Sequence, residues 1–112
     1  MIAKMDPHTR ERHEFVAQAI LKQPPSFFAR RGVSFQSGTD DLNAFRVAEL
    51  VVDDIPFALM RHEGIPRDET EVYLPDNIPL NRIATVIGCI LREFGLPATA
   101  IRWQRRRSDT PS

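Results

Sequence analysis

Apolar residues recur at helical spacing over residues 80–94, where they gather on one face of a helix. This pattern predicts a helix whose start is capped by Asp76 or Asn77, with Pro79 in its first turn. Gly95 then favours a left-handed closure, and the proline two residues later cannot continue the helix. We therefore expect the helix to end at Gly95.

A second helical pattern begins at Asp6 and Pro7. Aspartate can accept hydrogen bonds from the free amides of a first turn, and proline is preformed for the first helical position. Apolar side chains then recur at helical spacing, at Phe15, Val16, Ala19 and Ile20. Because Pro24 and Pro25 stop a helix, we predict an amphipathic helix over 7–22.

The middle of the chain alternates between apolar and polar residues in a way that predicts a β-hairpin with its turn at Asp53-Asp54. That turn pairs Val52 with Ile55, Leu50 with Phe57, and Ala48 with Leu59, and it collects these six side chains on one face. The other face is mixed and carries Val47, Val51, Ala58 and Met60 between polar neighbours. A helix within residues 39–50 is the alternative, because Thr39 and Asp40 are good N-caps.

The segment from 25 to 41 carries weaker signals. Residues 26–32 suit one helical turn closed by Gly32, and residues 33–36 alternate as a short strand does. The composition of residues 37–41 is that of a loop.

Two further strands are predicted near the C-terminal helix. Residues 70–75 alternate apolar and polar side chains after a turn, and residues 98–103 follow the helix as a last strand. In that strand, Trp103 falls on the same side as Ile101, so we expect it to lie in the core.

These elements predict a single α+β domain over 1–112 in the order α-(β)-β-β-β-α-β. Its antiparallel sheet would have three to five strands, with two main helices packed on one face. Residues 1–5 and 105–112 are expected to be frayed termini.

The composition fits a soluble globular protein, because 42% of the residues are hydrophobic and 27% are charged. No apolar run is long enough for a membrane span, so no membrane partner is expected. The single cysteine indicates a reducing, cytoplasmic compartment. Thirteen of the fifteen basic residues are arginine, which we attribute to a GC-rich bacterial genome.

Charge is unevenly spread although the formal net charge is zero. Residues 37–76 contain ten acidic residues and three arginines, whereas residues 92–107 contain five arginines and one glutamate. The two regions either pair within one fold or form complementary surfaces that favour self-association.

Sequence signatures of catalysis and of cofactors are missing. His8 and His13 are five residues apart, and zinc-binding helices use spacings of three or four. Cys89 has no CxxC partner, and no histidine is placed by sequence to activate it. The five glycines form no phosphate-binding loop. We expect no metal and no cofactor, and a non-catalytic protein is favoured over an enzyme.

The leading hypothesis is an interaction module that forms a homodimer. It rests on the mixed hairpin face and on a helix with a possible second contact side, and it takes Val47, Val51, Met60 and Cys89 as interface residues.

A first alternative is nucleic-acid binding by the basic C-terminal segment, through Arg102, Arg105, Arg106 and Arg107. The neutral net charge and the acidic middle of the chain count against it.

A second alternative is a small ligand-binding protein or hydrolase. The hairpin register pairs Arg46 with Arg61, and with His62 these residues would hold an anion. The competing interpretation pairs the two arginines with Glu71 or another acid of the sheet.

Overall fold

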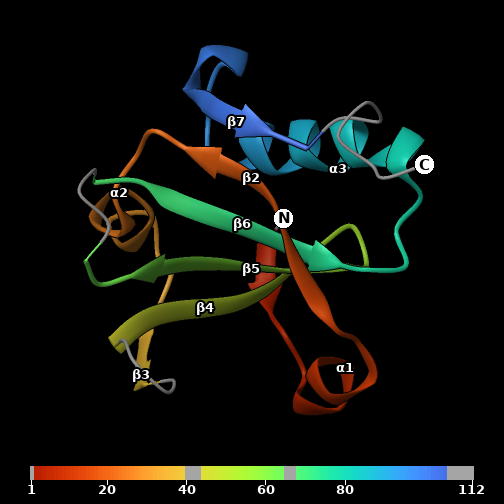
Figure 1. Ribbon diagram of the computed structural model, residues 1–112, viewed down its shortest axis with the longest axis horizontal. Helices are drawn as coiled ribbons and strands as arrows, with labels where there is room; N and C mark the ends of the chain where they lie inside the picture. The colour runs from red at the N-terminus through yellow and green to blue at the C-terminus, as the bar shows by residue number, and fades with distance from the viewer. Residues whose placement is uncertain (1, 40–43, 65–67, 106–112) are drawn as a thin grey trace.

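The computed structural model describes residues 2–39, 44–64 and 68–105. Within these residues it forms one seven-stranded sheet, three α-helices and a short 3-10 helix (Figure 1). The strands are β1 (Ile2–Lys4), β2 (Phe15–Leu21), β3 (Gln36–Thr39), β4 (Ala44–Val52), β5 (Ile55–His62), β6 (Thr70–Pro75) and β7 (Ile101–Gln104). The helices are α1 (Pro7–Arg12), α2 (Pro25–Ala29), α3 (Leu80–Glu93) and the 3-10 helix η1 (Ala98–Ala100). The prediction of a mixed α+β fold with an antiparallel sheet is confirmed. The described residues form seven strands and three α-helices, whereas three to five strands and two main helices were predicted.

The strand order is β1-β4-β5-β6-β2-β7, and β3 also pairs with β4. β1 pairs with the stretch of β4 from Leu50 to Val52, and β3 pairs with the stretch from Ala44 to Val47. The two short strands therefore share one edge of β4, one after the other. The opposite edge of the sheet is β7.

The β4–β5 hairpin has the predicted register, from Val52 opposite Ile55 to Ala48 opposite Leu59. Both turn residues are left-handed, with φ of 48° at Asp53 and 64° at Asp54. This is the backbone of a type I′ turn, whose twist matches that of the flanking strands. The described part of the segment, from Ala44 onward, is strand rather than the alternative helix.

The left-handed turn predicts the effect of substitutions at Asp54. We expect Asp54→Gly to stabilise the fold by about 0.5 kcal/mol, because glycine carries no Cβ penalty at positive φ. Asp54→Val should destabilise it by about 1 kcal/mol or more for the opposite reason.

Urea unfolding measures both effects. Asp76→Gly is the control, because Asp76 is exposed and lies outside the left-handed region, so added flexibility there should cost stability. A loss of stability on Asp54→Gly would contradict the assigned turn.

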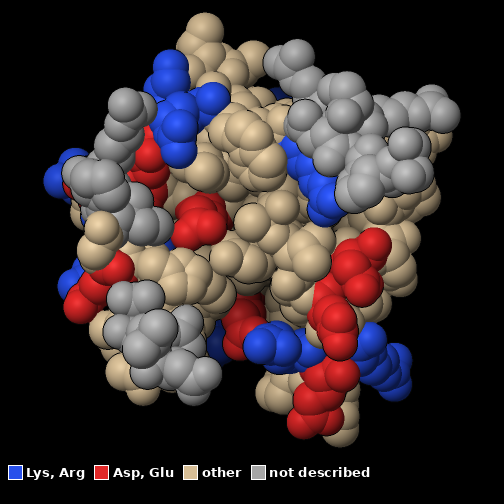
Figure 2. All heavy atoms as spheres, in the orientation of Figure 1, with Lys and Arg blue, Asp and Glu red and all other residues tan. Residues whose placement is uncertain are grey.

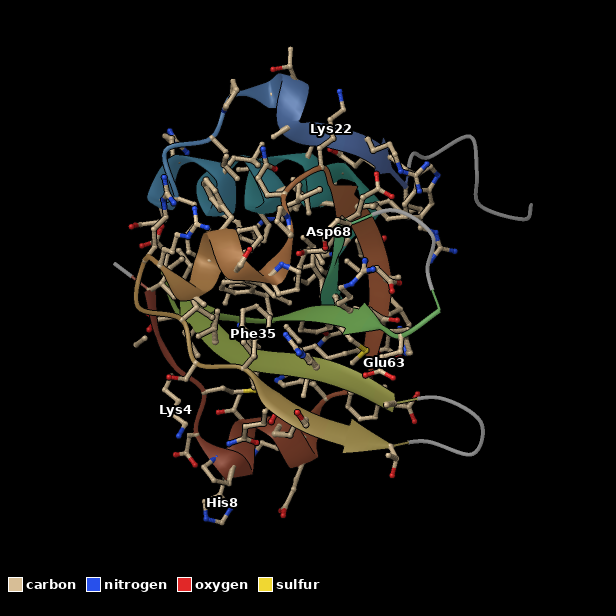
Figure 3. The ribbon with its side chains drawn as sticks, turned by 90° about the vertical axis from the view of Figure 1, so that its left-hand side faces the viewer. Lys4, His8, Lys22, Phe35, Glu63 and Asp68 are labelled. Atoms are coloured by element: carbon tan, nitrogen blue, oxygen red, sulfur yellow. The ribbon has the colours of Figure 1, made fainter. Side chains whose placement is uncertain are left out.

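The core lies between the inward face of the sheet and the helices α2 and α3, which Figures 1 and 3 show on one side of the sheet. Phe28 of α2 is fully buried and packs edge-to-face on Phe94, with ring centroids 4.8 Å apart. The end of α3 is closed as predicted. The amides of Gly95 and Leu96 bond back to the carbonyls of Arg92 and Leu91, and Gly95 has a φ of 68°.

The predicted helix over 7–22 is wrong beyond Arg12. Residues Phe15–Leu21 form β2, which pairs with β6 on one side and with β7 on the other. The register shifts between Ala17 and Ala19, and the shift buries Gln18 next to Ala19. Such a bulge breaks the two-residue alternation of a strand. Phe15, Val16, Ala19 and Ile20 therefore recur at helical spacing although they lie in a strand.

Trp103 is 39% exposed, so its predicted place in the core is wrong. Between Ile20 and Leu21 the register with β7 shifts by one extra residue on β7, which sets Ile101 beside Leu21 but Trp103 beside Ile20. Leu21 is fully buried, whereas Ile20 lies on the opposite face of the sheet, away from α2 and α3. The shift therefore turns Trp103 away from the core.

Other boundaries also differ from the prediction. Residues 2–4, expected to be frayed, pair with β4, and β3 covers residues 36–39 rather than 33–36. In β3, a Cβ added to Gly38 would lie 2.6 Å from the ring of Phe45, its partner across the ladder. β7 begins at Ile101, after η1. Residue 105 bonds to β2, and residues 106–112 lie outside the described chain.

The capping prediction for α3 is wrong as well. Pro79 occupies the N-cap of α3, and no side chain caps it. The amide of Asp76 instead donates to the carbonyl of Glu14.

No helix in the described ranges has the length and apolarity that crossing a bilayer requires.

Candidate functional site

The face of the sheet opposite α2 and α3 carries an apolar band. One ladder row crosses five neighbouring strands and consists of Val47, Met60, Glu71, Ile20 and Trp103. Four of these five side chains are apolar, and all five are at least partly exposed. We call this face of the sheet the outward face.

The next row of the outward face consists of Glu49, Ala58, Tyr73 and Ala17. Val51 and Pro56 lie beyond it on the hairpin, and Phe15 lies beyond it on β2. Figure 2 shows the molecule from this side, with uncharged surface in the middle and charged groups around it. α1 reaches only the margin of the face, where Arg10 forms an ion pair with Glu49 and lies 5.8 Å from the ring centroid of Phe15.

A polar cluster interrupts the apolar band. The carboxylate of Glu71 lies 3.1 Å from Nδ1 of His62 and accepts a 3.4 Å hydrogen bond from the hydroxyl of Tyr73. Glu71 and His62 are largely buried, with side-chain exposures of 18% and 25%. Burial, followed by the charge and the hydrogen bond of Glu71, raises the pKa of Tyr73 from 10.0 to about 12.

The raised pKa of Tyr73 predicts a loss of stability at alkaline pH. Between pH 10 and about pH 12 the folded chain keeps a phenolic proton that the unfolded chain releases. The stabilising contribution is therefore complete below pH 10 and falls as the pH rises towards 12.

Urea unfolding at about pH 9 and about pH 11 measures this fall, and Tyr73→Phe should reduce it. Tyr73 is the only tyrosine, so no other phenol contributes. Equal falls in the two proteins would contradict the link between Tyr73 and Glu71.

The three residues of the predicted anion site do not converge. Arg46 and Arg61 face each other across the ladder, as predicted, and Arg46 is exposed. The guanidinium of Arg61 donates to the carbonyl of Glu69 at 3.2 Å and lies 3.8 Å from the carboxylate of Asp68. His62 follows Arg61 on the same strand and so projects to the other face, where it contacts Glu71.

The basic segment is partly engaged in the fold. Arg102 pairs with Glu69, whose side chain is only 9% exposed, and the amide of Arg105 donates to the carbonyl of Gln18 at 2.8 Å. Arg106 and Arg107 lie outside the described residues. Arg102 and the backbone of Arg105 therefore take part in contacts that hold β7 to the rest of the fold.

Three of the four predicted interface residues lie together. Val47, Val51 and Met60 share the outward face and are partly exposed. Cys89 lies on α3, in the other layer, and its sulfur accepts a 3.4 Å contact from Arg92. Sequence reasoning missed Ile20, Tyr73, Ala17 and Trp103 as members of this face.

Among the described residues, no three His, Cys, Asp or Glu side chains are grouped so that they could hold a metal ion. The outward face remains as the candidate site, because it is the broad apolar surface that the helices leave uncovered. Comparisons with protein-family models, curated proteins and solved structures give no match to this chain.

Proposed function

We propose that this chain is a non-catalytic interaction module that self-associates through the outward face of its sheet. The observation that carries the proposal is the ladder row from Val47 to Trp103, in which four of five side chains are apolar and none is fully buried. Two sheets commonly bury such faces against each other, about 10 Å apart.

A second copy suits this face better than an unrelated partner, because the face is complementary to itself. Its β4 margin carries the Arg10–Glu49 ion pair, and its β7 margin carries the Arg102–Glu69 ion pair and Arg105. In a twofold arrangement the row of one copy meets the row of the other in reverse. The Arg102–Glu69 pair of one copy then lies opposite the Arg10–Glu49 pair of the other, and Trp103 lies over the apolar hairpin.

The size of the face predicts a weak dimer. Five strands about 5 Å apart span about 20 Å, and six residues along a strand span about 20 Å, so the flat patch is on the order of 400 Å². A standard interface buries about 800 Å² on each partner. We therefore expect the dimer to dissociate at micromolar rather than nanomolar concentrations.

Sedimentation velocity from about 1 µM to about 1 mM tests self-association, because this range brackets a dissociation constant in the tens of micromolar. The wild-type chain should shift from monomer to dimer, and Met60→Asp should remain monomeric. The emission of Trp103, the only tryptophan, should move to shorter wavelength as the dimer forms.

The matched control is Thr85→Asp, which adds the same charge to the exposed side of α3. It should dimerise as the wild type does. A wild-type chain that stays monomeric at the highest concentration ends the proposal, and so does equal weakening by both substitutions.

Nucleic-acid binding is the second candidate, and the exposure of Trp103 between Arg102 and Arg105 favours it. Aromatic side chains flanked by cations stack on the bases of single strands. The ion pair of Arg102 with Glu69 counts against it.

Quenching of Trp103 by a mixed-sequence single strand tests this candidate. The quenching should appear at low salt, disappear as salt is raised, and weaken on Arg105→Gln. A spectrum unchanged at low salt rules the candidate out.

A further inference from the structure

A cavity of about 1000 Å³ lies at the edge of β4, where β1 and β3 follow each other. Its walls come from β1, α1, the segment 31–36, residues 47–50 of β4 and the end of α3 at 92–95. Figure 3 shows this side of the molecule, with Lys4 of β1 lying below the segment that carries Phe35. The cavity is therefore assembled from parts of the chain that are distant in sequence.

Apolar side chains form much of the cavity lining. Met5, Val33, Leu50 and Phe94 line the cavity although each is only 6–7% exposed, and the partly exposed Ile2 adds apolar surface to the lining. Binding pockets for small molecules combine such an apolar lining with a few polar groups that fix the orientation of the ligand. The lining therefore suits a ligand with a hydrocarbon or aromatic body.

Arg31 is an exposed cation in the cavity wall, and it contacts Phe27. Its guanidinium carbon lies 3.6 Å from the ring centroid of Phe27, and its Nη1 donates to the carbonyl of Phe27 at 3.2 Å. This is the only hydrogen bond of its side chain within the described residues. A guanidinium carries five N–H donors, so most of them are left for a ligand. The two contacts with Phe27 restrict the guanidinium before binding, which lowers the conformational entropy that Arg31 loses when an anion binds.

The charges of the lining limit the charge of the ligand. The cations are Lys4, Arg10, Arg31 and Arg92, and the acids are Glu11, Glu49 and Glu93. Arg10 pairs with Glu49, which neutralises both. The formal excess of one positive charge suits one anionic group, and the acids would repel a polyanion.

We propose that this cavity binds a small organic anion, made of one carboxylate or one phosphate group on an apolar body. The anionic group bonds to Arg31, and the apolar body contacts Met5, Val33, Leu50 and Phe94. Val47 and Glu49 belong both to the cavity lining and to the outward face, but binding of the anion does not require the dimer.

Titration of the ¹⁵N-labelled full chain, followed by amide chemical shifts, tests the proposal with three probes that share a tail: octanoate, octyl phosphate and 1-octanol. We expect octanoate, octyl phosphate or both to shift the amides of 3–5, 31–33 and 92–95. The alcohol should bind at least about tenfold more weakly, because it lacks the charged bond to Arg31. Binding of one anion and not the other decides between carboxylate and phosphate.

Arg31→Gln should weaken binding of the anions about tenfold and leave binding of the alcohol unchanged. The matched control is Arg30→Gln, because Arg30 is the exposed neighbouring arginine and does not line the cavity. The same titration on Met60→Asp should give the same affinities, so failure of the dimer proposal would not affect this one.

Three results would overturn the cavity proposal. In the first, the alcohol binds as tightly as the anions, or no probe binds at all. In the second, the shifted amides map to the outward face of the sheet. In the third, Arg30→Gln weakens binding as much as Arg31→Gln does.

Discussion

Leu21→Asp is expected to leave the chain unfolded, whereas the same substitution at the neighbouring Ile20 should leave it folded. Leu21 is fully buried in β2, where an unpaired carboxylate costs several kcal/mol. Domains of this size are stable by only about 5–15 kcal/mol. Ile20 lies on the outward face and is partly exposed, so Ile20→Asp should cost about 1 kcal/mol. Circular dichroism and urea unfolding measure both effects.

These neighbouring substitutions distinguish a strand from a helix. In a helix over 7–22, Ile20 belongs to the apolar stripe with Val16, and Leu21 lies about 100° away from Ile20. Ile20→Asp would then be the more damaging substitution. A folded Leu21→Asp protein, or an unfolded Ile20→Asp protein, would contradict the strand β2 and its bulge.

The elements that could be predicted are those whose signals are local. The β4–β5 register follows from a two-residue turn and from six apolar positions that any slip of one residue would scatter. The end of α3 follows from Gly95. In each case a few neighbouring residues decide the structure.

The elements that were predicted wrongly depend on pairing with distant segments. The side of β2 that is buried changes at the bulge near Gln18, and nothing in the sequence marks a bulge there. β3 consists of polar residues and glycine, and it forms because β4 offers a free edge and Phe45 packs over Gly38. β1 likewise depends on the edge of β4.

In the candidate site too, the residues fixed by local signals were predicted and those fixed by distant pairing were missed. Val47, Val51 and Met60 were found because the hairpin register alone fixes their side of the sheet. Ile20 and Trp103 were missed because their sides depend on two register shifts. The cavity beside Arg31 combines four separate segments, so no spacing between residues could reveal it.

Phe57→Ala and Met60→Ala should separate folding from association on the two faces of β5. Phe57 is fully buried opposite Leu50, so its truncation should lower the free energy of unfolding by about 3–5 kcal/mol. Met60 lies on the outward face, where truncation should lower it by about 1 kcal/mol. Urea unfolding at a concentration that keeps the chain monomeric measures these differences.

For the dissociation constant of the dimer the order should be reversed, so that a substitution at Met60 has a larger effect than one at Phe57. Met60→Ala removes apolar area from the proposed interface and should raise the constant about tenfold. Phe57→Leu keeps most of the buried volume, so the chain stays folded, and it should leave the constant unchanged. If Phe57→Leu weakened the dimer as much as Met60→Ala, association would depend on the stability of the whole fold rather than on the outward face. If neither weakened it, the contact would lie elsewhere, and α3 with Cys89 would be the next surface to examine.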